Sequence, residues 1–328
     1  MVSADSAELA ALPVQLARLL STTAIGRTAV FLDETGSTNT AAEELERDSA
    51  APEGTVVVAL TQTSGRGRHG RPWSSPPKKG LYASFLLRPK VHARYAVAPA
   101  MLLAAAACDA LAEEGVQALL KWPNDLLVRG HKCGGLLSEG KIQGDMLTSC
   151  IVGLGINLLQ TAAELPGRPL FSATSLFLEC GRAPGLAELL ARICNCFEPP
   201  YMSWRQAALA VTASSTGNPN PPPIRLQGSQ RAHHEDPLPH FPPPAGGETE
   251  GGAAASTSNR RWIQGNELMA WRRRADALLA FRGARVRVAC ASGDVEGVVL
   301  GLGDRGELRL AGDDGRERHL IEGDLLLL

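Results

Sequence analysis

Several protein classes are excluded by what this sequence of 328 residues lacks. It has almost no net charge, with 33 Lys+Arg against 34 Asp+Glu, which argues against a general binder of nucleic acids or membrane surfaces. Its seven cysteines contain no C-x-x-C pair and are odd in number, so neither a zinc site nor a disulfide framework is predicted. Reduced thiols in an intracellular compartment are expected instead. No apolar run is expected to approach the roughly 20 residues of a membrane span.

Positive charge is instead concentrated in one short segment, Gly65-Arg66-Gly67-Arg68-His69-Gly70-Arg71-Pro72-Trp73. Glycine lets the backbone approach a ligand, and each arginine brings a planar, permanently charged fork that matches phosphate or carboxylate. The segment therefore predicts an anion-binding loop. Its glycines also match a dinucleotide-binding turn, but Pro72 forbids the helix that such a turn must open. An Arg-Gly tail that binds RNA and a merely solvated basic loop are the other readings.

Hydrophobic patterning predicts alternating strands and helices over the first two hundred residues. Gly153 and Gly155 lack the third glycine of a dinucleotide fold, and close backbone approach within a sheet is expected there. A turn at 129–131 predicts a hairpin that places Lys132 at the start of its second strand. Strands are expected at 28–32, 54–60, 81–87, 118–121, 126–128, 133–139 and 149–154, and helices at 9–20, at 96–114, at 185–197 and in a segment that ends near 47.

The composition changes after residue 204. Nine of the 22 prolines lie between 217 and 244, and 246–258 is almost wholly small or polar. Such a segment buries too little apolar surface to offset its ordering entropy, so disorder is predicted, and His233 and His234 are not expected to hold a metal. A disordered surface insertion and a translated intron are both open interpretations. A helix at 271–281 and short strands with turn signals up to 328 predict a small β-barrel.

Taken together, these stretches resemble the biotin protein ligases, also called biotin–[acetyl-CoA-carboxylase] ligases or holocarboxylase synthetases. The resemblance covers 31–197 in the family's order and spacing, and 283–328 looks like its small C-terminal domain. It implies an α+β fold: a catalytic domain like class II aminoacyl-tRNA synthetases, with a mixed sheet flanked by helices, and a C-terminal SH3-like β-barrel. The motifs that carry it are Ser37-Thr38-Asn39, Gln62, the 65–73 loop, Lys121-Trp122-Pro123-Asn124-Asp125-Leu126, Lys132 to Gly135 and Gly153 to Asn157.

The resemblance implies a reaction in two steps. ATP and biotin would give biotinyl-5′-adenylate and pyrophosphate, and biotin would then pass to one lysine of a biotin carboxyl carrier protein or domain. Attack on the α-phosphate gathers charge on oxygens, a demand that fixed cations meet. Mg²⁺ is expected to bridge phosphate oxygens, with no protein ligand predicted for it, although Asp125 could assist. By matched positions, Lys132, Arg66 and Arg68 would be catalytic; Ser37, Thr38, Asn39, Gln62, Gly65, Arg66 and Gly135 would bind biotin; and Arg68, Arg71, Trp73, Asn124, Asp125, Lys132 and Asn157 would bind ATP.

The expected division is a helical extension at 1–27, the catalytic domain at 28–204, the insertion at 205–270 and the small domain at 271–328. Two features depart from the family: the insertion, and Pro199-Pro200, which are expected to break a helix that the family continues. The extension is too short for a DNA-reading winged helix, so no repressor role, DNA partner or membrane partner is expected. A lipoate–protein ligase, a non-catalytic biotin-binding sensor and an RNA-binding module are the alternatives. The cytoplasm is the expected compartment, with a plastid as the alternative; the acceptor and the oligomeric state stay open.

Overall fold

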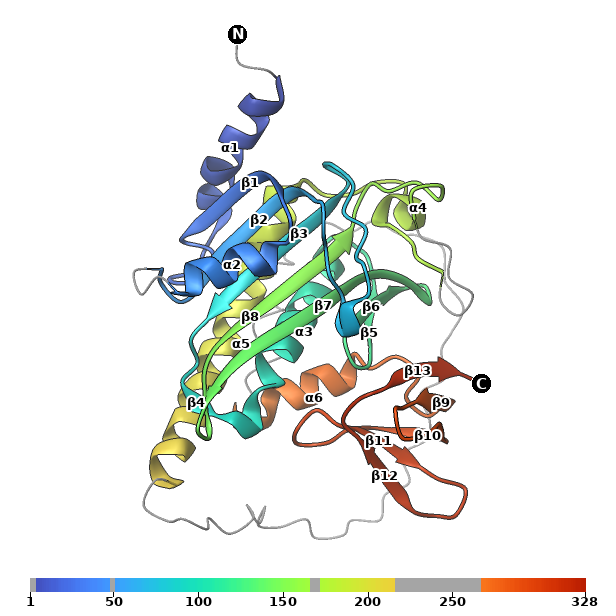
Figure 1. The fold of residues 1–328 in the computed structure, drawn as a ribbon. Coiled ribbons are helices and arrows are strands. Elements are labelled where there is room, and N and C mark those ends of the chain that lie inside the picture. The colour runs from blue at the N-terminus through green and yellow to red at the C-terminus, as the bar shows by residue number, and fades with distance from the viewer. Residues whose placement is uncertain (1–3, 48–50, 166–171, 216–266) are drawn as a thin grey trace, which may run out of the picture.

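The computed structural model describes residues 4–47, 51–165, 172–215 and 267–328, which form two sheets with helices around the larger one (Figure 1). The larger sheet has eight strands in the order β1-β2-β3-β8-β7-β6-β5, with β4 paired to β8. β1 and β2 run parallel, while the pairs from β2 to β5 along this order are antiparallel. The predicted α+β fold with a mixed sheet is confirmed. The strands are β1 (Ala29–Thr35), β2 (Thr55–Gln62), β3 (Gly80–Leu87), β4 (Val91–His92), β5 (Ala118–Lys121), β6 (Asp125–Val128), β7 (His131–Gln143) and β8 (Met146–Asn157).

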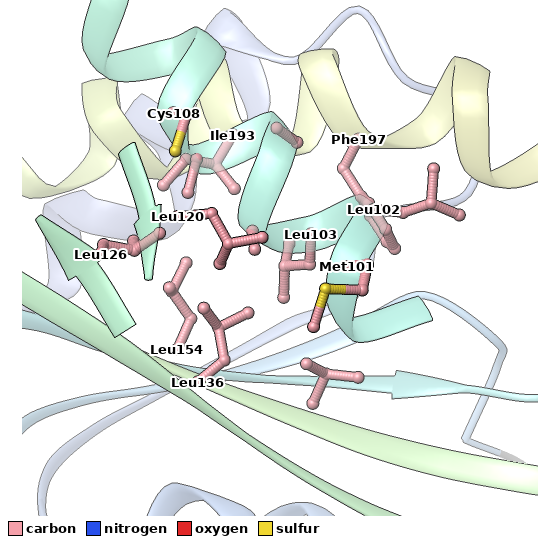
Figure 2. Packing of buried hydrophobic residues seen from close by; sticks show 14 of the residues in the cluster. Met101, Leu102, Leu103, Cys108, Leu120, Leu126, Leu136, Leu154, Ile193 and Phe197 are labelled. Atoms are coloured by element: carbon pink, nitrogen blue, oxygen red, sulfur yellow. The ribbon is translucent and has the colours of Figure 1, made fainter. Parts of the chain in front are cut away.

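Helices cover both faces of this sheet, as Figure 1 shows. Successive side chains of a strand point to opposite faces, so each face needs its own apolar cover. Val56 and Val58 join the large core against α3 and α5, whereas Val57 packs in a smaller cluster with Ala42 of α2. Figure 2 shows the large core, where Met101, Leu103 and Phe197 lie among the strands' leucines. The helices are α1 (Ala4–Leu19), α2 (Thr38–Arg47), α3 (Ala98–Glu113), α4 (Leu176–Cys180), α5 (Leu186–Ser215) and α6 (Ala270–Ala277).

The α3 region corrects one expectation. The stretch Ala93–Glu113 is long and apolar enough to cross a membrane by length and composition, whereas no such run was expected. Within the fold, 83% of its most apolar window is buried. Its alanines lie at the centre of the large core, so packing against the sheet and α5 accounts for its composition.

The helix α5 corrects a second expectation, because it continues through Pro199 and Pro200 to Ser215. A proline inside a helix removes a hydrogen bond and costs about 3 kcal/mol. Fully buried aromatic side chains flank the pair: Phe197 stacks on Tyr201 at 5.1 Å between ring centroids, and Trp204 follows one turn later. Burial of these three rings offsets the cost of the prolines, which local propensity alone could not predict.

The same helix changes the start of the expected insertion. Residues 205–215 belong to α5, and η4 (Glu267–Met269) and the first residue of α6 occupy 267–270. The remaining residues, 216–266, with His233 and His234, lie outside the described part of the chain. The helix expected at 271–281 is shorter than predicted, since α6 ends at Ala277.

The C-terminal residues form a five-stranded antiparallel sheet in the order β12-β11-β10-β9-β13. This sheet docks beside β5, where Leu120 N donates to Leu278 O and Ala280 N donates to Leu120 O, both at 2.8 Å. Trp122 Nε1 also donates to Gly306 O at 3.0 Å. The edge of the large sheet is thereby covered by the C-terminal part. Its strands are β9 (Arg285–Ala289), β10 (Val295–Leu302), β11 (Leu308–Ala311), β12 (Glu317–Leu320) and β13 (Asp324–Leu327).

A buried carboxylate ties the segment before β1 to α5. Glu198 of α5 accepts hydrogen bonds from the backbone N–H groups of Thr23 (2.6 Å), Ala24 (2.8 Å) and Ile25 (2.7 Å). The Thr23 hydroxyl donates a fourth at 3.0 Å. Burial raises the pKa of Glu198, but the backbone donors outweigh it and the pKa is lowered overall. The anchor therefore depends on the ionised carboxylate.

Candidate functional site

A cavity of about 330 Å³ opens on the α2 face of the large sheet and reaches the C-terminal sheet. Its wall comes from the start of α2, the end of β2, the 65–73 loop, the turn between β5 and β6, the strands β7 and β8, and β13. The fold therefore gathers segments that are distant in sequence. Of the predicted site residues, twelve line it: Ser37, Thr38, Asn39, Gln62, Arg66, Arg68, Arg71, Trp73, Asn124, Asp125, Lys132 and Gly135.

One end of the cavity is a network of neutral polar groups. Thr38 N donates to Gln62 Oε1 at 2.8 Å, and Gln62 Nε2 donates to Ser75 Oγ at 2.8 Å, which fixes the orientation of the Gln62 amide. Ser84 of β3 is fully buried, and its Oγ lies 2.8 Å from Thr38 Oγ1 and 2.6 Å from Asn39 Oδ1. A buried polar group is stable only when hydrogen-bonded, so this end is preorganised for a polar ligand head.

The Asn39 side chain lies across the sheet because Gly153 leaves room for it. Ser84, Gly153 and Leu137 are register partners on the adjacent strands β3, β8 and β7. A Cβ on Gly153 would lie 3.1 Å from Asn39 Cγ and closer still to Asn39 Oδ1. Asn39 thus spans from Ser84 to β7, where its Nδ2 donates to Glu139 Oε2 at 2.6 Å and to Leu137 O at 3.3 Å.

The arginine loop folds back on itself over the cavity. Trp73 N donates to Gly65 O at 2.8 Å, and Gly67 N donates to Arg71 O at 2.7 Å. Between these bonds lie one 3₁₀ turn, η1 (Arg68–Gly70), and a residue in the left-handed region, His69 (φ 55°). Three guanidinium groups are thereby held at one cavity wall, which provides the fixed cations that an anion needs.

Two of these arginines have acidic neighbours. Arg66 Nη2 lies 3.2 Å from Thr40 Oγ1 and 3.7 Å from Glu139 Oε1. Arg71 pairs with Asp324 of β13. The hydrogen bond to Asp324 raises the pKa of Arg71, while at Asp324 burial works against ionisation but the Arg71 hydrogen bond lowers the pKa. The loop is therefore linked electrostatically to the C-terminal sheet.

Two lysines share one carboxylate deeper in the cavity. Lys132 Nζ lies 2.5 Å from Asp125 Oδ1, and Lys121 Nζ lies 3.4 Å from Asp125 Oδ2. Burial lowers the pKa of Lys121, although Asp125 opposes the shift. Two cations facing a single carboxylate leave this part of the wall with net positive charge, which favours an anionic ligand.

The Trp73 indole packs against Gly155 of β8. An added Cβ on Gly155 would be 2.6–2.7 Å from three indole atoms, so only glycine allows this contact. Lys132 Nζ lies 5.4 Å from the ring centroid, within the range of a cation–π contact. The close backbone approach predicted for Gly153 and Gly155 is confirmed, with Asn39 and Trp73 as the groups that approach.

Three predicted residues have mainly structural contacts. Gly65 is the first residue of the loop, where a Cβ would be 2.6 Å from Trp73 O, and it does not line the cavity. Asn157 is also outside the lining; its Nδ2 donates to Thr174 O at 2.9 Å and its Oδ1 accepts from Gln160. Asn124 lines the cavity, and its Nδ2 donates to Leu136 O at 2.7 Å.

Sequence reasoning missed other residues of the site. Ser84 and Glu139 were not singled out, because a serine and a glutamate inside strands carry no local signal. Asp324 and the lining residues Leu325 and Leu326 come from β13, whose position beside the cavity depends on how the two sheets dock.

No cluster of three or more His, Cys, Asp or Glu that could hold a metal occurs within 4–47, 51–165, 172–215 and 267–328. The cavity's acidic residues Asp125 and Asp324 are each paired with a cation. The site can therefore bind a ligand with a polar head and an anionic region, but its side chains do not fit a metal held by protein alone.

Comparisons with known proteins show which family and which relatives the chain resembles. Residues 31–157 match the model of the biotin/lipoate A/B protein ligase family. The chain is 37% identical over 186 residues to the bifunctional ligase/repressor BirA of Bacillus subtilis, which covers 56% of this chain and 57% of that protein. It is 30% identical over 180 residues to the biotin--[acetyl-CoA-carboxylase] ligase of Mycobacterium tuberculosis, covering 53% and 64%. The chain thus spans less than two thirds of the length of these relatives.

Among solved structures, a biotin protein ligase from Aquifex aeolicus in complex with biotin and ATP superposes with a TM-score of 0.58 at 22% identity. The match covers 92% of this chain and 99% of that chain. At this identity the likeness shows a shared fold, and it includes the C-terminal part of the chain.

Proposed function

We propose that this chain, whose residues 31–157 match the model of the biotin/lipoate A/B protein ligase family, is a biotin–protein ligase. It would activate biotin with ATP to biotinyl-5′-AMP and transfer the acyl group to a lysine of a biotin carboxyl carrier protein or domain. The observation that carries the proposal is the single cavity that joins the polar network at Thr38 and Gln62 to the cationic wall of Arg66, Arg68 and Lys132. A ligand with a polar head and a carboxylate tail next to a phosphate requires this order of groups.

The polar end suits a ureido head. A ureido group has one carbonyl that accepts hydrogen bonds and two N–H groups that donate them. Thr38 Oγ1 and Gln62 Oε1 can accept from the N–H groups. A dithiolane head, as in lipoate, has no N–H or carbonyl to satisfy these buried partners, so biotin is the better fit.

The first step would be attack of a biotin carboxylate oxygen on the α-phosphorus of ATP, with pyrophosphate leaving. Both reactants are anionic, so their approach is opposed unless cations lie beside them. Lys132, which lies next to Asp125 and the Trp73 ring, would contact both the carboxylate and the phosphate. Arg66 and Arg68 would stabilise the negative charge as it shifts to the leaving group, and Arg71 would face the outer phosphates.

In the second step the amine of the acceptor lysine would attack the acyl carbon, and AMP would leave. The adenylate is a mixed anhydride that water hydrolyses, so the site must exclude water until the acceptor arrives. The folded arginine loop and the Trp73 ring line the cavity and would help to keep water away from the adenylate. Mg²⁺ would enter on the phosphate oxygens of ATP, because the paired acids of the cavity do not form a metal site. The cytoplasm remains the compartment that we predict.

The test measures pyrophosphate release and biotin transfer to a purified carrier domain with ATP and Mg²⁺. We expect Lys132→Gln to reduce both by at least a hundredfold, which corresponds to about 2.7 kcal/mol of transition-state stabilisation. Lys141→Gln is the matched control, since Lys141 lies on the same strand and pairs with Glu46 outside the cavity. It should retain activity within twofold.

Three outcomes would contradict the proposal. Transfer of lipoate in preference to biotin would identify a lipoate ligase. Biotin binding without pyrophosphate release would identify a sensor. Equal loss in Lys132→Gln and Lys141→Gln would show that the charge at position 132 has no special role.

A further inference from the structure

Glu139 lies beside the polar end of the cavity without lining it. Residues of a strand alternate between the two faces, so Gly135, Leu137 and Glu139 of β7 share the face toward α2. Gly135 and Leu137 line the cavity, and the next residue on that face is Glu139. Its carboxylate accepts from Asn39 Nδ2 at 2.6 Å and lies 3.7 Å from Arg66.

This contact fixes which way the Asn39 amide points. An ionised carboxylate accepts hydrogen bonds and donates none. With the amide reversed, Asn39 Oδ1 would face Glu139 Oε2 and also Leu137 O, so three acceptors would meet without a proton. The Nδ2 group must therefore point toward β7, and Oδ1 must point toward Ser84.

The direction of the remaining protons follows from Asn39. Ser84 has one hydroxyl proton, and Asn39 Oδ1 at 2.6 Å can only accept, so Ser84 donates to it. The 2.8 Å hydrogen bond between Ser84 and Thr38 then takes its proton from Thr38 Oγ1. Because the single hydroxyl proton of Thr38 goes to Ser84, the longer 3.2 Å contact between Thr38 Oγ1 and Gln62 Oε1 carries no proton. Gln62 Oε1 accepts from Thr38 N, and both oxygens keep a lone pair for a ligand.

We propose that Glu139 is a positioning residue that makes the end of the cavity at Thr38 and Gln62 an acceptor of ligand N–H groups. The inference rests on the proposed function and deepens it. Glu139 does not contact the ligand; it acts through Asn39 and Ser84, so that the two ureido N–H groups meet acceptors and a ligand with an acceptor in their place is rejected. Specificity for the ureido head thus depends on Glu139, a residue of β7 outside the cavity lining.

The test exchanges the amide and the carboxylate. Glu139→Gln removes the obligate acceptor and should weaken biotin binding at least fivefold. Asn39→Asp places two carboxylates together and should weaken it at least tenfold. In the double variant Asn39→Asp/Glu139→Gln, the new amide donates to the new carboxylate, which still accepts from Ser84. The double variant keeps the net charge, and its Kd should return to within threefold of the parent.

The measurement is the Kd for biotin and for the analogue in which oxygen replaces one ureido N–H, by isothermal titration calorimetry on the full chain. Preference for biotin over the analogue should fall in Glu139→Gln and return in the double variant, which a purely structural role would not produce. Glu43→Gln is the control, because Glu43 is a surface residue of α2 paired with Arg47.

The outcomes separate two failures. If the parent binds biotin and the double variant is as weak as the two single effects multiplied, or if Glu139→Gln changes Kd by less than twofold, this inference is wrong and the proposed function stands. If the parent does not bind biotin, the proposed function fails and the inference falls with it.

Discussion

Gly153→Ala is the sharpest probe of the polar end of the site. The added methyl would lie 3.1 Å from Asn39 Cγ and inside the contact limit of Asn39 Oδ1, which the hydrogen bonds to Ser84 and Glu139 hold in place. The glycine is on β8 between two paired strands, so its backbone cannot retreat without breaking the ladder. Asn39 must therefore move.

The size of the effect follows from the bonds that Asn39 would lose. A neutral hydrogen bond such as that to Ser84 contributes about 0.5–1.5 kcal/mol, and one to a charged group such as Glu139 about 1.5–3 kcal/mol. Replacing glycine by alanine restricts the unfolded chain and returns about 0.4–1 kcal/mol. We expect the unfolding free energy to fall by about 1–4 kcal/mol and the Kd for biotin to rise at least tenfold.

The assay is urea denaturation together with titration calorimetry, and Gly36→Ala is the matched control. A Cβ on Gly36 meets nothing within 4 Å and requires no left-handed backbone, so the same substitution there should leave both quantities unchanged or raise stability slightly. The reasoning is refuted if Gly153→Ala behaves like Gly36→Ala in stability and in biotin affinity.

Two further predictions concern the anchor of the N-terminal segment and the indole over β8. Glu198→Gln should lower the unfolding free energy by about 2–4 kcal/mol, because an amide cannot accept from all four donors. The pKa of Glu198 is lowered in the folded state, so its contribution to stability is complete above the unfolded pKa of about 4.3 and is lost as pH falls through the folded pKa. Between about pH 6 and 3, the unfolding free energy should therefore depend less steeply on pH in Glu198→Gln than in the parent. An equal slope in the two proteins would contradict this. Gly155→Ala should displace the Trp73 ring from β8, which should shift the tryptophan fluorescence emission to the red and weaken the affinity for ATP. The emission shift should be absent when the same substitution is made in a Trp73→Phe background. Unchanged emission in Gly155→Ala would show that the ring does not rest on Gly155.

Local chemistry determined much of this protein in advance. Pro72 and a residue in the left-handed region, His69, keep the 65–73 segment from forming an α-helix, and its charge predicts an anion-binding loop in any fold. Runs of β-branched and aliphatic residues specified the strands of the large sheet, because a strand buried on both faces needs no polar side chains. Gly153 and Gly155 of β8 predicted that other groups approach the strand's backbone closely, because a glycine has no side chain in the way.

Only the tertiary structure decided which groups meet. The path of α5 through Pro199 and Pro200 depends on the burial of rings that lie on either side of them, a gain that is absent in the isolated segment. Asp324 reaches Arg71 because the C-terminal sheet docks along β5. Ser84 and Glu139 acquire their roles from register, which places strands far apart in sequence within reach of one asparagine. Motifs can be found in the sequence because their chemistry is local, whereas the hydrogen-bond direction across the sheet requires all of its strands to be in place.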